Sequence, residues 1–188
     1  MALTTFRTLT ALGAVTVTAC LAVSASPATA TTREASVTGA GRVFYAPAPD
    51  DDVRFTFDAH AVSATGGRTP RPVDARGTVR VYHRVAAQGL AVWAEGEVNC
   101  VMTSGRAATL TAIVTRTSPE LGGWTGKHLG FTVFDGGADS GRSHDQMGST
   151  GPVDTLPKCM ASDDPYAPVM APAPFFTLQA GDYRVKPA

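Results

Sequence analysis

The sequence predicts an all-β protein, a single antiparallel β-sandwich or barrel of about seven or eight strands with one disulfide. Apolar and polar residues alternate in many short runs, as they do in strands with one buried face. Clusters of glycine, proline and aspartate separate these runs and indicate turns. No segment after the N-terminal region shows a convincing helical period.

The clearest strand pattern covers residues 53–60, where Val53, Phe55 and Phe57 alternate with polar residues. Since successive side chains of a strand point to opposite faces, we expect these three to face the core. Similar runs occur at 77–84, 91–100, 108–116 and 129–135, and shorter candidates at 42–46, 175–178 and 182–186.

Three stretches interrupt the alternation and are expected to be loops. Residues 47–52 read as an acidic turn, and residues 63–76 contain too much glycine and proline for a central strand. The longest, residues 148–174, contains six prolines and exceeds the usual length of a connection.

The N-terminal segment predicts export. Residues 1–30 carry one basic residue, an apolar stretch and the small-residue ending Ala28-Thr29-Ala30, which together indicate a secretory signal peptide. An alternative is lipidation at Cys20, whose preceding residues resemble a lipobox. Cleavage after Ala30 is preferred, because the apolar run continues past Cys20. Residues 31–188 would then form one secreted β domain.

Either cleavage leaves Cys100 and Cys159 as the ordinary thiols of the exported chain. A disulfide between them is expected, because oxidising compartments keep such pairs bonded. It would pin the proline-rich loop to the strand that ends at Cys100. The alternative is two separate buried thiols.

Charge argues against several classes of partner. The whole chain has 16 basic and 16 acidic residues, so loss of Arg7 with the signal peptide leaves a net charge near −1. Neither nucleic acid nor an anionic membrane surface is expected to bind such a chain. No second apolar run is long enough to span a bilayer.

Several segments together resemble a known group of proteins. They are "DDVRFTFDAH", "WAEGEVNCV", "ATLTAIVTR", "LGGWTGKHLGFTVFD" and "LPKC", in that order. The chain resembles small secreted proteins of high-GC Gram-positive bacteria that are often labelled repetin. The resemblance covers most of residues 40–186 and implies export, a β-rich domain and the Cys100/Cys159 pair. It supplies no catalytic residues, since the label specifies no reaction.

The run "LAVWAEGEVNC" places Trp93, Glu95 and Glu97 on one face of a strand. A sugar-binding or sugar-cleaving strand has this composition, but so does an ordinary sheet face. If the strand pairs with residues 77–84, Arg80 lies opposite Glu95 in one register and opposite Glu97 in the other. An arginine there would lower the carboxylate pKa, whereas a general acid needs it raised. We therefore expect a structural face and keep these three residues only as weak binding candidates.

Asp135, Asp139 and Asp145 lie in the glycine-rich stretch "FDGGADSGRSHDQ". Flexible, oxygen-rich loops suit calcium, so the three carboxylates are weak metal candidates. Their spacing is not that of an EF-hand, and Arg142 would place a cation inside the loop. A solvated hairpin loop is the preferred interpretation, and no cofactor is expected.

Trp124 and the histidines are the remaining candidates. Trp124 is flanked by glycines and either anchors a ligand from a loop tip or, as we expect, packs over one end of the domain. The four histidines lack the spacing of a zinc site. His83 continues an inward face and is expected to be hydrogen-bonded at the rim of the core.

The sequence thus favours a secreted, non-catalytic domain with a binding or structural role. Its partner would be an unknown extracellular ligand, such as cell-wall glycan or protein. One alternative is a small glycan-directed hydrolase that uses Glu95, Glu97 and Asp135 in a barrel mouth. Another is a protease inhibitor with an exposed loop at 117–126 or around Cys159. A hydrolase should bring two carboxylates, or a carboxylate and a histidine, into one concave pocket.

Overall fold

The computed structural model describes residues 32–64, 71–139, 142–161 and 171–188. The predicted signal peptide and the alternative lipidation site at Cys20 lie outside these ranges. The described chain forms eight long or medium strands and one two-stranded hairpin. The eight are β1 (Thr32–Val43), β2 (Asp52–Ala64), β3 (Arg71–Val85), β4 (Leu90–Ser104), β5 (Ala107–Thr117), β6 (His128–Phe134), β9 (Gln146–Ser149) and β10 (Phe176–Lys186). The hairpin consists of β7 (Ala138–Asp139) and β8 (Arg142–Ser143).

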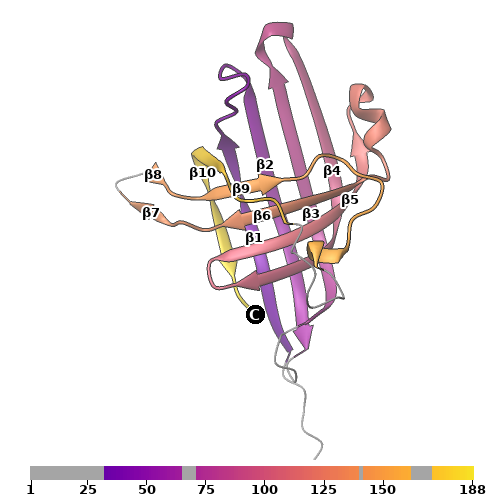
Figure 1. Cartoon of the computed structure of the whole chain (residues 1–188), viewed down its shortest axis with the longest axis vertical. Helices are drawn as coiled ribbons and strands as arrows, with labels where there is room; N and C mark the ends of the chain where they lie inside the picture. The colour runs from indigo at the N-terminus through magenta and orange to yellow at the C-terminus, as the bar shows by residue number, and fades with distance from the viewer. Residues whose placement is uncertain (1–31, 65–70, 140–141, 162–170) are drawn as a thin grey trace, which may run out of the picture.

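The eight antiparallel strands close into a barrel, which confirms the all-β prediction and decides between sandwich and barrel. Their order is β1-β10-β9-β6-β5-β4-β3-β2, and β1 also pairs with β2 along its whole length. β1, β2 and β3 run lengthwise, and β5, β6 and β9 cross them (Figure 1). The barrel is therefore built from two layers that share strands at their corners.

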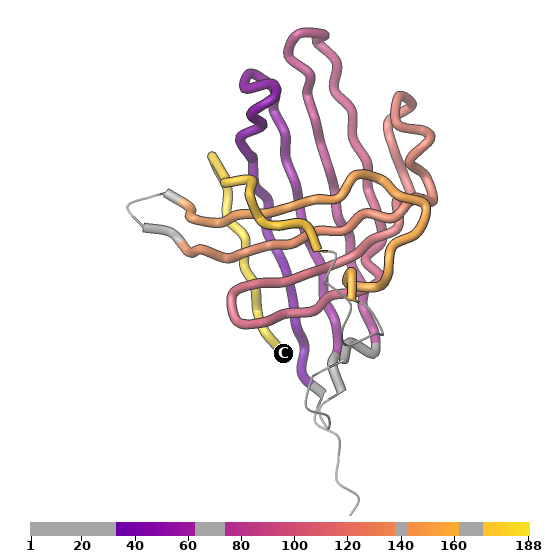
Figure 2. The backbone as a smooth tube through the Cα atoms, in the orientation of Figure 1, coloured from indigo at the N-terminus to yellow at the C-terminus, as the bar shows by residue number. Residues whose placement is uncertain are grey.

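β4 belongs to both layers. It leaves its hairpin with β3 lengthwise and then turns to join β5 (Figure 2). Its register against β5 shifts between Glu95 and Gly96 and again between Val98 and Cys100. Such bulges bend a strand and increase its twist. At Gly96 a Cβ atom would lie 2.9 Å from the carbonyl oxygen of Ile113, so only glycine allows this close approach.

The interior is filled by the predicted inward face of residues 53–60. Phe57 is 2 % exposed, and its ring makes edge contacts with Phe131 at 5.4 Å and Tyr183 at 5.2 Å between ring centroids. Such T-shaped pairs stabilise a core beyond their buried area. These three rings occupy the middle of the barrel.

In the described ranges, three short 3-10 helices connect the strands. They are η1 (Ala86–Gln88), η2 (Pro119–Trp124) and η3 (Lys158–Met160). Within the described ranges, no helix is long and apolar enough to span a membrane.

One predicted loop and several predicted strand bounds differ in the structure. β2 extends to Ala64 and β3 begins at Arg71, so much of the 63–76 loop belongs to the sheet. β1 covers 32–43 rather than 42–46, β9 includes only the first two residues of the proline-rich segment, and β10 is continuous across Gly181. The reason is that partners in the closed barrel supply ladder hydrogen bonds to glycine-rich stretches whose composition alone indicates turns.

Gly77 of β3 illustrates this constraint. It pairs with Ala59 of β2 and has φ of 115°. A Cβ atom there would lie 1.8 Å from the carbonyl oxygen of Asp58. The close approach of the two strands therefore requires glycine at this position of the predicted strand 77–84.

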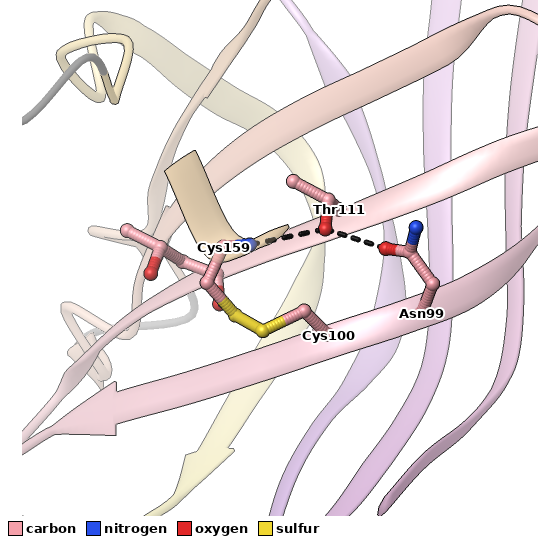
Figure 3. Close-up of a disulfide and its surroundings, with 5 residues drawn as sticks. Asn99, Cys100, Thr111 and Cys159 are labelled. Carbon is pink, nitrogen blue, oxygen red and sulfur yellow. Dashed lines mark hydrogen bonds between the residues drawn. A yellow bond between two sulfur atoms is a disulfide. The ribbon is translucent and has the colours of Figure 1, made fainter. Parts of the chain in front are cut away.

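The predicted disulfide between Cys100 and Cys159 is confirmed, with a Cα–Cα distance of 5.3 Å (Figure 3). The Thr111 hydroxyl accepts the Cys159 N–H at 3.1 Å and donates to the Asn99 side chain at 2.6 Å.

We call residues 150–161, which include Cys159, the strap. Because a Cβ at Gly130 would lie 2.5 Å from the Met160 sulfur, the glycine leaves room for the strap to pack on β6.

Removing the disulfide should destabilise the barrel without changing its fold. The bond closes a loop between residues 59 positions apart, which the chain-entropy model values at about 4 kcal/mol. We expect the double variant Cys100→Ala/Cys159→Ala to lose up to that amount in urea denaturation. As a check of the premise, thiol alkylation without reductant should leave the intact mass of the native protein unchanged. Alkylation of both cysteines would contradict it.

Gly77→Ala should destabilise the protein far more than Gly89→Ala. Both glycines have positive φ, but at Gly89 no atom lies within 4 Å of an added Cβ. The matched control Gly89→Ala should cost about 1 to 2 kcal/mol, the penalty for a left-handed alanine. Gly77→Ala adds a backbone clash, so its loss of unfolding free energy should be clearly larger. Equal losses in the two variants would show that β2 and β3 can separate at this point.

Candidate functional site in the barrel mouth

One end of the barrel contains a pocket of about 410 Å³. The end of β3 and the beginnings of β2, β4 and β6 form its wall. That wall is mainly apolar, with Val53, Phe55, Val81, Val92 and Leu129 among the lining residues. The pocket adjoins the aromatic core, because the Phe55 ring contacts the Phe131 ring at 6.1 Å between centroids.

The segment η2 covers one side of the pocket. The Ser118 N–H donates to the Trp93 carbonyl at 2.8 Å, and the Trp93 N–H donates to the Ser118 hydroxyl at 3.2 Å. These bonds fasten the start of η2 to β4. Leu121 and Trp124 are half-buried, pack against the core and line the pocket. The prediction that Trp124 packs over one end of the domain is confirmed.

A histidine and a buried carboxylate meet at the pocket rim. Oδ2 of Asp51 lies 2.6 Å from Nε2 of His83, and Oδ1 accepts the Ala86 N–H at 2.9 Å. Asp51 is 6 % exposed, whereas the His83 side chain is 30 % exposed and lines the pocket. The Ala86 N–H, followed by the His83 hydrogen bond, lowers the pKa of Asp51 below its ordinary value. Asp51 is therefore ionised at neutral pH and accepts both hydrogen bonds.

The His83 ring is held from two sides. Asp51 binds one ring nitrogen, and the Tyr45 ring contacts the imidazole edge-on at 5.6 Å between centroids. This confirms the prediction that His83 is hydrogen-bonded at the rim of the core. Among the described residues, Nδ1 has no hydrogen-bond partner. The apolar wall thus contains a fixed polar group that borders the pocket.

The opposite wall carries two hydroxyl groups. Ser149 and Thr150, at the end of β9, line the pocket, and β9 and β3 lie on opposite sides of the strand ring. The Thr150 hydroxyl accepts the Gly130 N–H at 2.9 Å, and the Ser149 hydroxyl donates to the Thr150 carbonyl at 2.8 Å. These bonds hold the end of β9 in place.

The predicted face of Trp93, Glu95 and Glu97 lies on the outside of the barrel. β3 and β4 adopt the first of the two predicted registers, with Arg80 opposite Glu95 and Tyr82 opposite Trp93. However, Glu95 forms its ion pair with Arg116 of β5. Arg80 lies over the Trp93 ring, 5.3 Å from its centroid. Trp93 borders the pocket, but its ring belongs to the outer face, as do both glutamates.

The three predicted metal candidates do not form a described metal site. Oδ2 of Asp145, which is fully buried, accepts the Tyr183 N–H at 2.6 Å. Oδ2 of Asp135 accepts the Val185 N–H at 3.2 Å. The Asp139 side chain lies outside the described residues, and the rest contain no cluster of three metal-ligating side chains. Asp135 and Asp145 instead satisfy the backbone of β10.

Sequence reasoning missed Asp51, because "PDDD" reads as an exposed acidic turn. The structure places Asp51 one residue before β2, and Asp52 lies opposite Arg84 in β3. Asp51 therefore lies beside the end of β3, within reach of His83 and Ala86. Only the β2/β3 register could have indicated this.

The Asp51 contribution to stability should disappear in acid. Because folding lowers its pKa, the carboxylate stabilises the fold above the ordinary value of 3.8, and this stabilisation is lost as the pH falls below that value. We expect Asp51→Asn to be less stable than the natural protein at neutral pH, with the difference shrinking at pH 3. Urea denaturation at both pH values measures this difference in unfolding free energy, and Asp50→Asn, at the exposed neighbouring residue, is the matched control. A pH-independent difference would contradict the assignment.

No relative supplies a function for this pocket. Comparison of the chain with models of protein families, with curated proteins and with solved structures gave no match. Its function must therefore be inferred from the chemistry of the pocket.

Proposed function

We propose that the protein is an extracellular binding protein that holds a small, largely apolar molecule in the barrel mouth. The observation that carries this proposal is the pocket of about 410 Å³, whose wall is mainly apolar and includes one fixed polar group, His83. Binding sites for small molecules are usually concave, apolar and equipped with a few placed polar groups. Eight-stranded barrels also have an interior wide enough for one small ligand.

The disulfide supports the extracellular part of the proposal. Cys100 and Cys159 are bonded, and such bonds persist in oxidising compartments. The predicted signal peptide leads to the same compartment. The resemblance to proteins labelled repetin agrees with export but adds no ligand.

Binding is favoured over glycan hydrolysis. Neither Glu95, Glu97 nor Asp135 lines the pocket, so the carboxylates suggested for a hydrolase do not meet there. His83 and Asp51 do bring a histidine and a carboxylate to the pocket, as a hydrolase would require. A nucleophile or a second acid is also needed for a relay, and the Ser149 hydroxyl already donates to a carbonyl group. The dyad is better suited to orienting a ligand.

Binding is also favoured over protease inhibition. An inhibitor loop must present side chains to its target. In residues 117–126, Leu121 and Trp124 instead pack against the core. Around Cys159, the neighbouring Met160 is 1 % exposed. In their described parts, both suggested loops thus pack large apolar side chains against the domain.

The test of pocket binding uses Prodan, a neutral fluorescent naphthalene without hydrogen-bond donors. We expect the natural protein to bind it with a blue-shifted emission, because the probe leaves water for an apolar pocket. Val92→Trp should weaken binding at least about tenfold by filling the pocket, which corresponds to about 1.4 kcal/mol. Ala91→Trp is the matched control, since Ala91 is the exposed neighbour on the opposite face of β4. No saturable binding, or equal binding by both variants, would overturn the proposal.

A further inference from the structure

We propose that the pocket selects ligands that present a hydrogen-bond donor, a hydroxyl or N–H group, to Nδ1 of His83, and that Asp51 sets this preference. The inference rests on the proposed function and specifies its ligand as a small, neutral, largely apolar alcohol, phenol or amine. The observation that carries the inference is that each of the two carboxylate oxygens of Asp51 has its own hydrogen-bond partner.

Asp51 fixes the position of the imidazole proton. The Ala86 N–H can only donate, so Oδ1 of Asp51 accepts that bond. Oδ2 lies 2.6 Å from Nε2 of His83, and an ionised carboxylate can only accept. Nε2 must therefore carry the proton. In the neutral imidazole, the other nitrogen, Nδ1, then has a lone pair and acts as an acceptor.

The surroundings make this acceptor selective. Nδ1 has no partner among the described residues, and Val53 and Val92, which lie opposite His83 on the two neighbouring strands, line the same pocket. A ligand that brings a donor recovers the hydrogen bond that it loses on leaving water. A ligand that brings only an acceptor leaves two lone pairs facing each other without compensation.

Ring orientation supports the same conclusion. The edge contact with Tyr45 and the hydrogen bond to Asp51 restrain rotation of the His83 side chain. A preorganised acceptor costs less conformational entropy on binding than a mobile one. The selectivity should therefore appear in affinity and should not require a large rearrangement.

The experiment compares 2-naphthol with 2-methoxynaphthalene as competitors of Prodan at pH 8, where an ordinary imidazole is neutral. The two share one ring system, but only the naphthol has a donor. We expect the natural protein to prefer 2-naphthol about tenfold, which one net hydrogen bond supplies. His83→Phe should abolish the preference. Nitrogen NMR of His83 should show the proton on Nε2.

Asp51→Asn provides the sharper test, because it should invert the tautomer. The asparagine oxygen is needed by the Ala86 N–H, so its NH₂ group would face Nε2 of His83 and donate to it. The proton must then move to Nδ1, which becomes a donor, and 2-methoxynaphthalene should bind more tightly than 2-naphthol. Asp58→Asn is the matched control, because Asp58 pairs with His60 at 2.9 Å on the outer face. It should leave the natural preference unchanged.

The outcomes separate the two proposals. If Prodan binds and both naphthalenes compete equally in the natural protein, pocket binding stands and donor selection is overturned. The same holds if Asp51→Asn moves the proton to Nδ1 without changing the preference. If Prodan does not bind, the proposed function fails, and donor selection fails with it.

Discussion

The structure depends on the position of β1 between β2 and β10. Val37 of β1 lies opposite Ala59 of β2 and Val185 of β10, so residues from both ends of the domain meet at one strand. This pairing closes the ring and gives β1 a hydrogen-bonded partner on both edges. Without it, β2 and β10 would both present unpaired edges, which promote aggregation. The enclosed core and the pocket above it both follow from this closure.

Closure at β10 needs help from side chains, because β9 is short. β9 pairs with β10 only at Phe176 and Thr177. Further along β10, the carboxylates of Asp145 and Asp135 accept the N–H groups of Tyr183 and Val185. Buried backbone donors without partners are costly, so these two aspartates extend the edge that β9 leaves incomplete. Burial, followed by the nearby Asp145 charge, raises the pKa of Tyr183, which keeps its buried hydroxyl neutral.

The barrel mouth combines a rigid wall with one oriented polar group. Strands hold most of the wall residues, and Asp51, which does not line the pocket, is hydrogen-bonded to the His83 ring, which does. Rigid elements position a binding group more precisely than loops do. The same arrangement would orient a general base. However, the other residues that line the pocket are mainly apolar, which suits binding. In the proposed function, the choice of ligand follows from which nitrogen of His83 carries the imidazole proton.

The sequence by itself determined the β class and the inward face of residues 53–60, because the alternation of apolar and polar residues is a local pattern. It also determined the Cys100/Cys159 bond and the packing of Trp124, because the cysteine count and the burial preference of tryptophan are properties of composition. Only the tertiary structure decided the closure of the barrel and the strand character of residues 71–76, since long-range partners supply their hydrogen bonds. The sequence did not predict the pocket either. Asp51 and His83 are distant in sequence, and their 2.6 Å contact arises from strand register, which composition does not encode.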